Sequence, residues 1–364
     1  MAKTENGGEN RSKKSPHRNL TEKELVARKK AARIKKKKKK RRIILLITTL
    51  LICLIAILIV SGFSSLSKIK RTKLNDDNLG ISDKFNKNSS NYSDVFDDIV
   101  NIALYGVDEE SYDTQRSDSI MIGTLDNTHK KLKITTLMRD TYVNIPGHGY
   151  DKLNHAYAYG GPQLSISTIN KNFDLNITDY VAVDFGELES IVNAIGGVTM
   201  DLSDEDINVL NEYLDYVYTF NKEPVKKVKR SSDGLVHLNG FEALSYGRNR
   251  STPDGDFGRT QRQRNLIEAM FNKISSFGTA KLASTMTKLL PYVETSLTNS
   301  EILTLGTQVL SLGNMSIEQA RFPRDDYSEN SLINDIFYFT FDEDIARREI
   351  YEYLFKDKKI WETE

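Results

Sequence analysis

Cysteine is nearly absent from this chain of 364 residues, in which Cys53 is the only one. A disulfide needs two cysteines, and thiol catalysis, cysteine-ligated zinc and iron–sulfur clusters all need at least one outside an apolar run. Because Cys53 lies within such a run, these kinds of chemistry are excluded for the rest of the chain. The folded part must therefore be held together by burial of apolar side chains, and its chemistry must come from other residues.

The balance of charge differs between the two ends of the chain. The formal net charge is only +1, but residues 1–42 carry 18 Lys and Arg against 4 Glu, which leaves 33 of the 51 basic and 46 of the 50 acidic residues for the remainder. This asymmetry indicates that the two parts face different surroundings. With 39% hydrophobic residues and no internal repeat, the acidic part has enough apolar material for one large domain or two small ones.

A long apolar run, IILLITTLLICLIAILIV, extends from Ile43 to Val60. As a helix it would span most of a bilayer core, and the basic stretch RIKKKKKKRR before it is typical of the cytoplasmic side. We therefore expect a basic cytoplasmic tail over residues 1–42, a transmembrane helix over 43–62 and an extracellular remainder, which is a single-pass type II topology in the cell membrane. The alternative, a cleaved signal peptide, needs a shorter apolar region and a small-residue cleavage site.

The lysine run in the basic tail also suggests nucleic-acid binding. Next to a membrane span, however, such a run determines topology and meets anionic lipid head groups. We therefore expect the membrane as a partner of this tail and no nucleic acid.

Short apolar runs rich in β-branched residues alternate with helical patterns after residue 98. Strands are predicted where such runs end at polar or turn residues, and helices where apolar residues recur at intervals of three and four. The predicted strands cover residues 100–106, 118–126, 132–138, 179–185 and 197–202, and the predicted helices cover 161–173, 186–196, 258–275 and 281–290. This alternation predicts an α/β fold. We expect a three-layer α/β/α sandwich with a central mixed sheet, preceded by one transmembrane helix.

The segments between and beyond these elements set the expected domain boundaries. Residues 63–97 are polar and predict an extracellular stalk. The charged stretch 212–234 predicts a loop. The main folded domain is expected over residues 98–276, followed by an extracellular C-terminal extension over residues 277–364.

Five arginines crowd into nineteen positions of the sequence GRNRSTPDGDFGRTQRQRN, residues 247–265. Arg248 and Arg250 follow the end of a predicted helix and point the same way if the backbone there is extended. A second group shares one face near the start of the next helix, because its members are three and four residues apart. This group consists of Arg259, Arg262 and Gln263. We call Arg248 and Arg250 the first arm and the group around Arg259 the second arm. The two arms can converge on one ligand.

The loop between the two arms contains Asp256, which stands just before the predicted helix. A carboxylate there can accept backbone N–H groups of the first turn and can orient the arginines. Guanidinium groups match phosphate oxygens bidentately, and a helix N-terminus adds positive potential, so the two arms suit a doubly phosphorylated group. The alternative is a solvated basic face with ordinary surface ion pairs. Arg264 is expected to face elsewhere.

Acidic residues stand at the ends of neighbouring predicted strands. Asp108 follows the first strand and Asp118 opens the second, beside Arg116. A pair of carboxylates with phosphate oxygens nearby suits magnesium, although aspartates in loops also commonly form caps and turns. Arg139 and Asp140 follow the third strand, again at a strand end, where α/β sheets place their ligands.

Five segments together resemble the LytR-CpsA-Psr family of cell-envelope proteins. They occur in the family's order between Val100 and Ile274, behind the expected N-terminal span. The segments are RSDSIMI, LMRDTYVNIPGHGYDKLNHAYAYGG, NAIGGVTMDL, GLVHLNGFEALSYGRNR and DGDFGRTQRQRNLIEAM.

The resemblance implies a membrane-anchored phosphotransferase. Such an enzyme moves an anionic glycopolymer, of the wall teichoic acid or capsular polysaccharide type, from a polyprenyl-pyrophosphate carrier to peptidoglycan. Asp108 and Asp118 would bind Mg²⁺, with Mn²⁺ as an alternative. The pyrophosphate would be bound by Arg116, Arg139, Arg248, Arg250, Arg259, Arg262 and Gln263. The catalytic residues would be Asp256, Arg248 and Arg250.

Several points stay open in the sequence. The acceptor hydroxyl needs a proton acceptor, and either Asp256 or Asp118 can serve. An apolar pocket for the lipid is implied between sheet and helices, to which residues 161–173, 185–195 and 266–274 could contribute. The alternative functions are those of an envelope regulator or binding protein for polyprenyl-pyrophosphate lipids, or of a hydrolase that acts on them.

Overall fold

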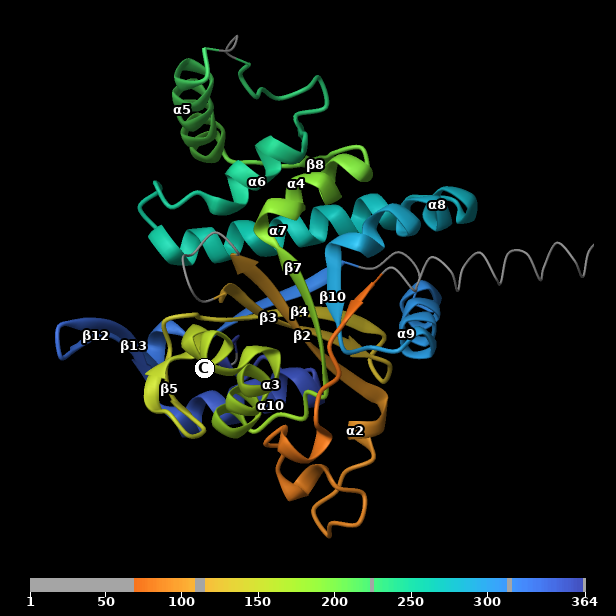
Figure 1. Ribbon diagram of the computed structural model, residues 1–364, viewed down its shortest axis with the longest axis vertical. Helices are drawn as coiled ribbons and strands as arrows, with labels where there is room; N and C mark the ends of the chain where they lie inside the picture. Colours follow the sequence, from red (N-terminus) through yellow and green to blue (C-terminus); the bar gives the residue numbers. More distant parts are fainter. Residues whose placement is uncertain (1–68, 109–114, 223–225, 313–315, 363–364) are drawn as a thin grey trace, which may run out of the picture. The chain divides into compact units, whose positions relative to one another are not determined.

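A mixed β-sheet lies at the centre of the fold (Figure 1). The structure is a computed structural model that describes residues 69–108, 115–222, 226–312 and 316–362. In this part of the chain seven strands form the sheet: β1 (Lys70–Arg71), β2 (Ile99–Asp108), β3 (Arg116–Asp126), β4 (Lys131–Leu137), β7 (Asp179–Asp184), β10 (Val293–Thr295) and β11 (Ile317–Phe322). Their order is β1-β10-β7-β2-β3-β4-β11. The pairs β1/β10, β2/β7 and β4/β11 are parallel, and the other three are antiparallel.

Helices cover both faces of this sheet. In Figure 1, α4 (Phe185–Ala194) and α7 (Gly255–Ser275) lie above it, and α3 (Leu153–Phe173) and α10 (Glu343–Lys356) lie below. The other α-helices are α2 (Val95–Asp98), α5 (Asp204–Phe220), α6 (Gly240–Arg248), α8 (Thr279–Leu289) and α9 (Asn299–Ser311). In the described residues, three two-stranded antiparallel sheets stand outside the central sheet: β5 (Tyr142–Ile145) with β6 (Gly149–Lys152), β8 (Val198–Met200) with β9 (Val236–Leu238), and β12 (Ser328–Ile333) with β13 (Ile336–Phe341). The predicted mixed α/β fold is thus confirmed.

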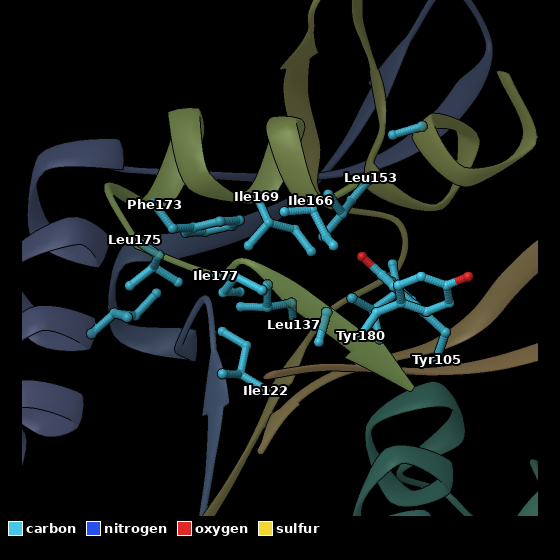
Figure 2. Packing of buried hydrophobic residues seen from close by; sticks show 14 of the residues in the cluster. Tyr105, Ile122, Leu137, Leu153, Ile166, Ile169, Phe173, Leu175, Ile177 and Tyr180 are labelled. Carbon is cyan, nitrogen blue, oxygen red and sulfur yellow. The ribbon is translucent and has the colours of Figure 1, made fainter. Parts of the chain in front are cut away.

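The alternation of side chains along the strands builds a separate core on each face. Tyr105 of β2 and Tyr180 of β7 point toward α3 and meet Ile169 and its neighbours (Figure 2). Leu104, one position along β2, packs with Met121 on the opposite face, beside α7. Because side chains of a strand alternate between the two faces, a sheet covered on both sides must be apolar at consecutive positions. Each fully buried large side chain contributes roughly 1.5–3 kcal/mol.

The predicted helix at residues 161–173 is only the second half of α3. The helix has non-helical backbone angles at Gly160 and Gly161, and Gly161 adopts φ +60°. Pro162 then fits the first turn of the new segment, where its missing N–H is not needed. The stretch from Leu153 to Gly160 was not predicted as helical.

The sheet also uses chain segments outside the expected main domain, which corrects the boundaries at residues 97 and 276. Within the predicted stalk, β1 pairs with β10, and Leu79 is almost completely buried. Within the predicted C-terminal extension, β11 pairs with β4 along six residues. The fully buried Lys133 of β4 donates to the carbonyl of Tyr353 in α10 at 2.7 Å. Both segments therefore cover core residues that the expected main domain, residues 98–276, would leave exposed.

Of two local predictions on the outer layer, the strand is confirmed and the loop is wrong in its first part. The predicted strand at residues 197–202 forms β8, which pairs with β9 and not with the central sheet. The first part of the predicted loop at 212–234 belongs to α5, which buries Leu210, Leu214 and Tyr218 at intervals of four. That spacing is a helical signal that the high charge of the segment concealed.

The predicted transmembrane helix at residues 43–62 lies outside the described residues. Within the residues that the structure describes, no helix has the length and apolar character needed to cross a bilayer.

Candidate active site

A β-bulge places Asp118 at the end of the sheet. Between β2 and β3 the register shifts, so that Gly106 pairs with Ser119 and Val107 with Ser117. Asp118 is therefore the extra residue of the bulge, with no partner of its own on β2. Bulges redirect side chains and are common beside active sites. The backbone of Asp108 lies opposite Arg116 in the same ladder, so both predicted metal ligands belong to this end of the hairpin.

Arg139 is the centre of the polar cluster. It follows β4, and its Nη1 donates to Asp118 Oδ1 at 2.6 Å. Its Nε lies 3.3 Å from Asp140 Oδ2, and its Nη2 lies 3.6 Å from Asp256 Oδ1. Burial opposes the charge of this guanidinium, but Asp118, Asp256 and Asp140 together raise the pKa of Arg139 above its ordinary value. Three segments far apart in the sequence thus meet at one arginine.

Asp256 faces this cluster from the first turn of α7. The sequence placed it before the helix as a possible cap, but α7 begins at Gly255, and neither carboxylate oxygen of Asp256 accepts a hydrogen bond. Arg259 Nη2 lies 2.8 Å and Arg250 Nε 3.7 Å from Asp256 Oδ1, as ion pairs without hydrogen-bond geometry. Burial raises the pKa of Asp256, although Arg139 and Arg250 act against this shift. The carboxylate is therefore suited to accept a proton.

The first predicted arm, Arg248 and Arg250, reaches the site from the end of α6. Asn249 between them has extended backbone angles, as expected. Arg250 is half exposed, and the guanidinium of Arg248, which is also exposed, lies 5.7 Å from the ring of Phe185. Arg116, at the start of β3, is exposed as well. These side chains remain accessible to a ligand.

The residues of the second predicted arm point in different directions. Arg259 reaches Asp256, but Arg262 donates to Asp206 Oδ1 on α5 and to Thr252 Oγ1 in the loop before α7, each at 2.7 Å. The prediction that Arg262 lies on the ligand side with Arg259 is therefore corrected. A spacing of three residues brings two Cα atoms to one side of a helix, but long side chains can still diverge from there.

Arg264 faces away from the cluster, as expected, but it is not a solvent-exposed bystander. Only 4% of it is exposed, and its Nη1 donates to Thr136 of β4 at 2.7 Å. Desolvation lowers the pKa of Arg264 to about 10. Arg264 therefore joins α7 to the sheet.

An apolar cavity of about 220 Å³ opens beside the arginines, between the sheet and the helices α4, α6 and α7. Its walls include Leu104, Met121, Val181, Ile191, Leu266 and Met270. Gln263 and Gly247 also line it, and Gln263 Oε1 is buried there without a hydrogen-bond partner in the described structure. The expected contribution of residues 185–195 and 266–274 is confirmed. Residues 161–173 belong to α3 on the other face, so their expected contribution is wrong.

Gly106 keeps this cavity open at the sheet. A Cβ atom there would lie 2.9 Å from Phe185 Cζ and 3.0 Å from Ser119 Cβ, closer than such contacts allow. The glycine thus lets the ring of Phe185 lie directly on the strand.

The donor groups at the bulge are of the right type for magnesium. Carboxylate oxygens are its preferred ligands in proteins, and it commonly takes one or two carboxylates with phosphate oxygens and water. Asp118 supplies such a carboxylate at 26% exposure. Among the described residues, no group of three or more His, Cys, Asp and Glu side chains is arranged to hold a metal ion. The residues present therefore fit a cation that is shared with phosphates.

Two polar residues beside the cluster were not assigned from the sequence. Lys152 Nζ donates to Asp140 Oδ1 at 2.8 Å, which links β6 to Arg139. Asp206, the partner of Arg262, lies on α5, and no local pattern marked it. On α3, His155 Nδ1 lies within hydrogen-bonding distance of Asp151 Oδ2, at 2.8 Å.

Comparisons with known proteins identify the family of the chain. The profile of the LytR_cpsA_psr family matches residues 57–352. The chain belongs to this family. Family membership thus covers β1, β10, β11 and most of α10, which the sequence had assigned to a stalk and an extension.

Relatives and a solved structure of the LytR_cpsA_psr family resemble this chain over most of its length. A Bacillus cereus protein named polyisoprenyl-teichoic acid–peptidoglycan teichoic acid transferase TagU is 34% identical over 257 residues, which is 68% of this chain and 78% of TagU. The regulatory protein MsrR of Staphylococcus aureus is 33% identical over 62% of this chain and 64% of MsrR. The Bacillus subtilis protein YwtF (TagT), solved with bound octaprenyl pyrophosphate lipid, aligns with a TM-score of 0.54 and 26% identity over 76% of this chain and 96% of that one.

Proposed function

We propose that this protein transfers an anionic glycopolymer from a polyprenyl-pyrophosphate carrier to peptidoglycan. The observation that carries the proposal is the position of the arginine cluster at the edge of an apolar cavity. Arg259 contacts Asp256, and one helical turn further along α7, Gln263 lines the cavity. A ligand that uses both regions must join a highly charged head to an apolar tail, as a prenyl pyrophosphate does.

The apolar cavity and the arginine cluster each suit one part of the carrier. Apolar walls from β2, β3, β7 and three helices suit the prenyl chain, since burial of apolar surface is the main favourable term there. The arginines Arg139, Arg250 and Arg259 suit the pyrophosphate, with Arg116 and Arg248 exposed at its approach. The names of TagU and of the lipid-bound YwtF (TagT) support the same division.

The reaction follows from this placement. An acceptor hydroxyl oxygen bonds to the phosphorus that carries the polymer, and the bond from that phosphorus to the bridging oxygen breaks. The prenyl monophosphate leaves with the bridging oxygen, and the polymer becomes joined to the acceptor by a phosphodiester. Arginines at the bridging oxygen stabilise the negative charge that develops there.

Asp256 is the better proton acceptor of the two left open by the sequence. Asp118 Oδ1 is already bound to Arg139, whereas the oxygens of Asp256 accept no hydrogen bond and burial raises the pKa of this carboxyl. A base with a raised pKa accepts a proton more readily in the transition state. We therefore assign proton abstraction from the acceptor hydroxyl to Asp256.

Asp118 and Asp108 are proposed to hold Mg²⁺, with Mn²⁺ as an alternative. When bound, such an ion would neutralise charge on the pyrophosphate oxygens. The protein itself orients Asp118 through the bulge and through its hydrogen bond with Arg139.

The apolar run from Ile43 to Val60, with its basic flank, supports a single-pass type II protein of the cell membrane whose enzymatic domain is extracellular. This location would bring the domain to its lipid carrier. The class of polymer, wall teichoic acid or capsular polysaccharide, is taken from the family, and the names of the relatives favour teichoic acid.

The test is a transfer assay with the purified full-length protein in detergent. It uses a lipid-linked teichoic acid precursor, soluble peptidoglycan oligomers and Mg²⁺, and mass spectrometry detects the phosphodiester-linked product. Release of free polymer without linkage would instead identify a hydrolase. Unchanged donor in a tight complex would identify a binding or regulatory protein, a role that the name of MsrR suggests.

Arg250→Ala is the matched variant for this assay, with Arg230→Ala as control. Arg250 contacts Asp256 in the cluster, whereas Arg230 pairs with Asp201 and Asp204 on the outer layer. We expect loss of both donor binding and product with the first variant and neither with the second. Full activity of Arg250→Ala would remove this residue from the site.

A further inference from the structure

Aromatic side chains gather beside the cluster on the side away from the apolar cavity. They come from the hairpin β5/β6, the start of α3 and the hairpin β12/β13, which lie close together in Figure 1. Tyr150, Tyr159 and Phe337 are 51%, 47% and 42% exposed. We call the group the aromatic platform; it consists of Tyr142, Tyr150, Tyr159, Phe337 and Tyr338. Exposed aromatics in such number mark an interaction surface.

Three rings of the aromatic platform, those of Tyr142, Tyr150 and Tyr338, are held in place by one another, and that of Tyr159 by a histidine. Tyr142 packs against Tyr150 with ring centroids 5.2 Å apart, and edge-to-face against Tyr338 at 4.7 Å. Tyr159 stacks on His148 at 4.6 Å. Pairs with these geometries are favourable in themselves. The platform therefore presents fixed ring faces rather than loose side chains, and little ordering is needed when a ligand binds.

A carboxylate lies in the middle of these rings. Asp151 Oδ2 accepts from the hydroxyl of Tyr159 at 2.7 Å and contacts His155 Nδ1 at 2.8 Å. The hydroxyl of Tyr338 lies 3.4 Å from Asp151 Oδ1. The surface thus combines apolar ring faces with hydroxyl and carboxylate groups.

The platform is joined directly to the proposed reaction centre. The backbone N–H of Phe339 donates to the carbonyl of Asp140 at 2.9 Å, and Thr141 forms a bridge with Phe339. Lys152 donates to Asp140 and lies 5.8 Å from the ring of Tyr338. Asp140 in turn contacts Arg139. A ligand on the aromatic platform would therefore extend toward Arg139.

We propose that the aromatic platform binds the sugar rings of the peptidoglycan acceptor. This inference rests on the proposed transfer function. Pyranose rings have apolar C–H faces that pack on aromatic rings, and hydroxyl and amide groups at their edges that bond to tyrosine hydroxyls and carboxylates. Both kinds of group are present around Asp151.

The position of the platform favours the acceptor over the sugars of the donor. The cavity proposed for the prenyl chain lies on the face of the sheet covered by α4 and α7, whereas the platform is built on β5, β6 and α3, the helix of the opposite face. In phosphoryl transfer the attacking and leaving oxygens lie roughly in line through the phosphorus. With the leaving prenyl phosphate on the cavity side, the attacking hydroxyl must arrive from the other side, where the platform lies.

The chemistry of the platform is less suited to a membrane surface. Interfacial membrane segments place cationic side chains around their aromatics to meet anionic lipids. Here the central charged group is the carboxylate of Asp151, and Lys152 is engaged by Asp140. A glycan meets these groups with hydroxyls, so the partner we infer is a glycan strand.

The test compares three variants of the full-length protein with the unaltered protein. In the double variant Tyr150→Ala/Phe337→Ala both exposed rings are lost; in Tyr150→Phe the ring is kept. The control is Tyr216→Ala, which removes a 68% exposed aromatic from α5, a helix of the outer layer. Chitotetraose, a β-1,4-linked N-acetylglucosamine tetramer, is the binding probe, and peptidoglycan oligomers are the acceptor in the transfer assay.

We expect the double variant to bind chitotetraose about tenfold more weakly, since two ring stacks are lost. Its KM for peptidoglycan oligomers should rise by a similar factor while kcat and binding of octaprenyl pyrophosphate stay unchanged. Tyr150→Phe, which keeps the ring, should bind chitotetraose more tightly than the double variant, and Tyr216→Ala should behave like the unaltered protein. An unchanged acceptor KM in the double variant would overturn the proposal.

Two further outcomes separate this inference from its alternatives. Loss of binding to vesicles of phosphatidylglycerol and phosphatidylethanolamine, with chitotetraose binding intact, would overturn it in favour of a membrane surface. If the unaltered protein binds chitotetraose through the platform but forms no phosphodiester product, the proposed transfer function fails and the sugar-binding surface stands.

Discussion

The guanidinium of Arg139 lies 3.6 Å from a carboxylate oxygen of Asp256, and the same oxygen is 2.8 Å from Arg259. Asp256 therefore occupies positions around the arginines that the oxygens of a phosphate group would take. The cluster is neutralised by its own carboxylates before any ligand arrives. In the function that we propose, binding of a pyrophosphate would exchange one anion for another and would release Asp256 to accept a proton.

Arg139→Ala should abolish most of the transfer activity. Its guanidinium contacts Asp118, Asp140 and Asp256 at once, and removal of one preorganised donor from a transition state typically lowers kcat by about 10²–10³-fold. Single-turnover assays with bound donor would measure the effect on chemistry. Arg139→Lys keeps the charge but not the fork of donors, so it should restore only a small part of the rate. Full restoration by lysine would show that charge alone matters.

The rate should depend on the ionisation of Asp256. A general base must be deprotonated, and burial raises the pKa of Asp256 above the ordinary aspartate value of 3.8. Activity is therefore expected at pH values above this raised pKa and lost as the pH falls through it. The profile of kcat/KM against pH at constant ionic strength measures this acid limb.

Asp256→Asn should remove that limb and lower the rate by about 10²–10⁴-fold, the usual contribution of a general base. Asp118→Asn is the companion variant, because Asp118 was the other candidate for the base. If the acid limb disappears in Asp118→Asn and persists in Asp256→Asn, the assignment of the base is reversed.

Arg262→Ala should reduce stability rather than ligand binding. Arg262 and Asp206 are 7% and 18% exposed, and loss of one partner leaves a largely buried carboxylate unpaired. Breaking such a pair destabilises a protein by about 3 kcal/mol, which urea unfolding followed by circular dichroism would detect. Arg230→Ala, which breaks more exposed pairs, should leave the unfolding midpoint nearly unchanged. Weaker octaprenyl pyrophosphate binding by Arg262→Ala with unchanged stability would return Arg262 to the site.

Gly106→Ala should narrow the apolar cavity. The added Cβ would lie 2.9 Å from Phe185 Cζ, so the ring must move. We expect about tenfold weaker binding of octaprenyl pyrophosphate, which corresponds to about 1.4 kcal/mol of overpacking. Gly306→Ala on α9 is the control, because Gly306 does not line the cavity and its added Cβ would have no described atom within 4 Å. Titration by intrinsic fluorescence measures both, and equal affinities would show that Phe185 does not limit the cavity.

Local patterns in the sequence predicted the central elements well. The runs at residues 100–106, 118–126 and 132–138 became β2, β3 and β4, because strands buried on both faces are apolar at nearly every position. The helix predicted at 258–275 became α7, and Asp256 contacts Arg259, in line with the expectation that this carboxylate can orient arginines. These features depend on neighbours in the chain, which is why they could be predicted.

The features that could not be predicted depend on residues that are far apart in the sequence. β1 and β11 are recognised as strands of the sheet only once their neighbours β10 and β4 are in place. Arg262 was grouped with Arg259 because nothing in its own segment points to Asp206 on α5. The aromatic platform likewise joins residues near 150 and near 338, so no single motif contains it.

The bulge at Asp118 separates two parts of one strand that are under different structural constraints. Inward of it, side chains such as Ile120 and Ile122 fill the core, and almost any change there affects folding. Outward of it, the ladder continues with a shifted register, so a residue can be inserted or lost beside Arg116 without moving the buried side chains of the strand to the other face of the sheet. A family built on this sheet can thus vary its chemistry at one end of a hairpin while the other end stays fixed.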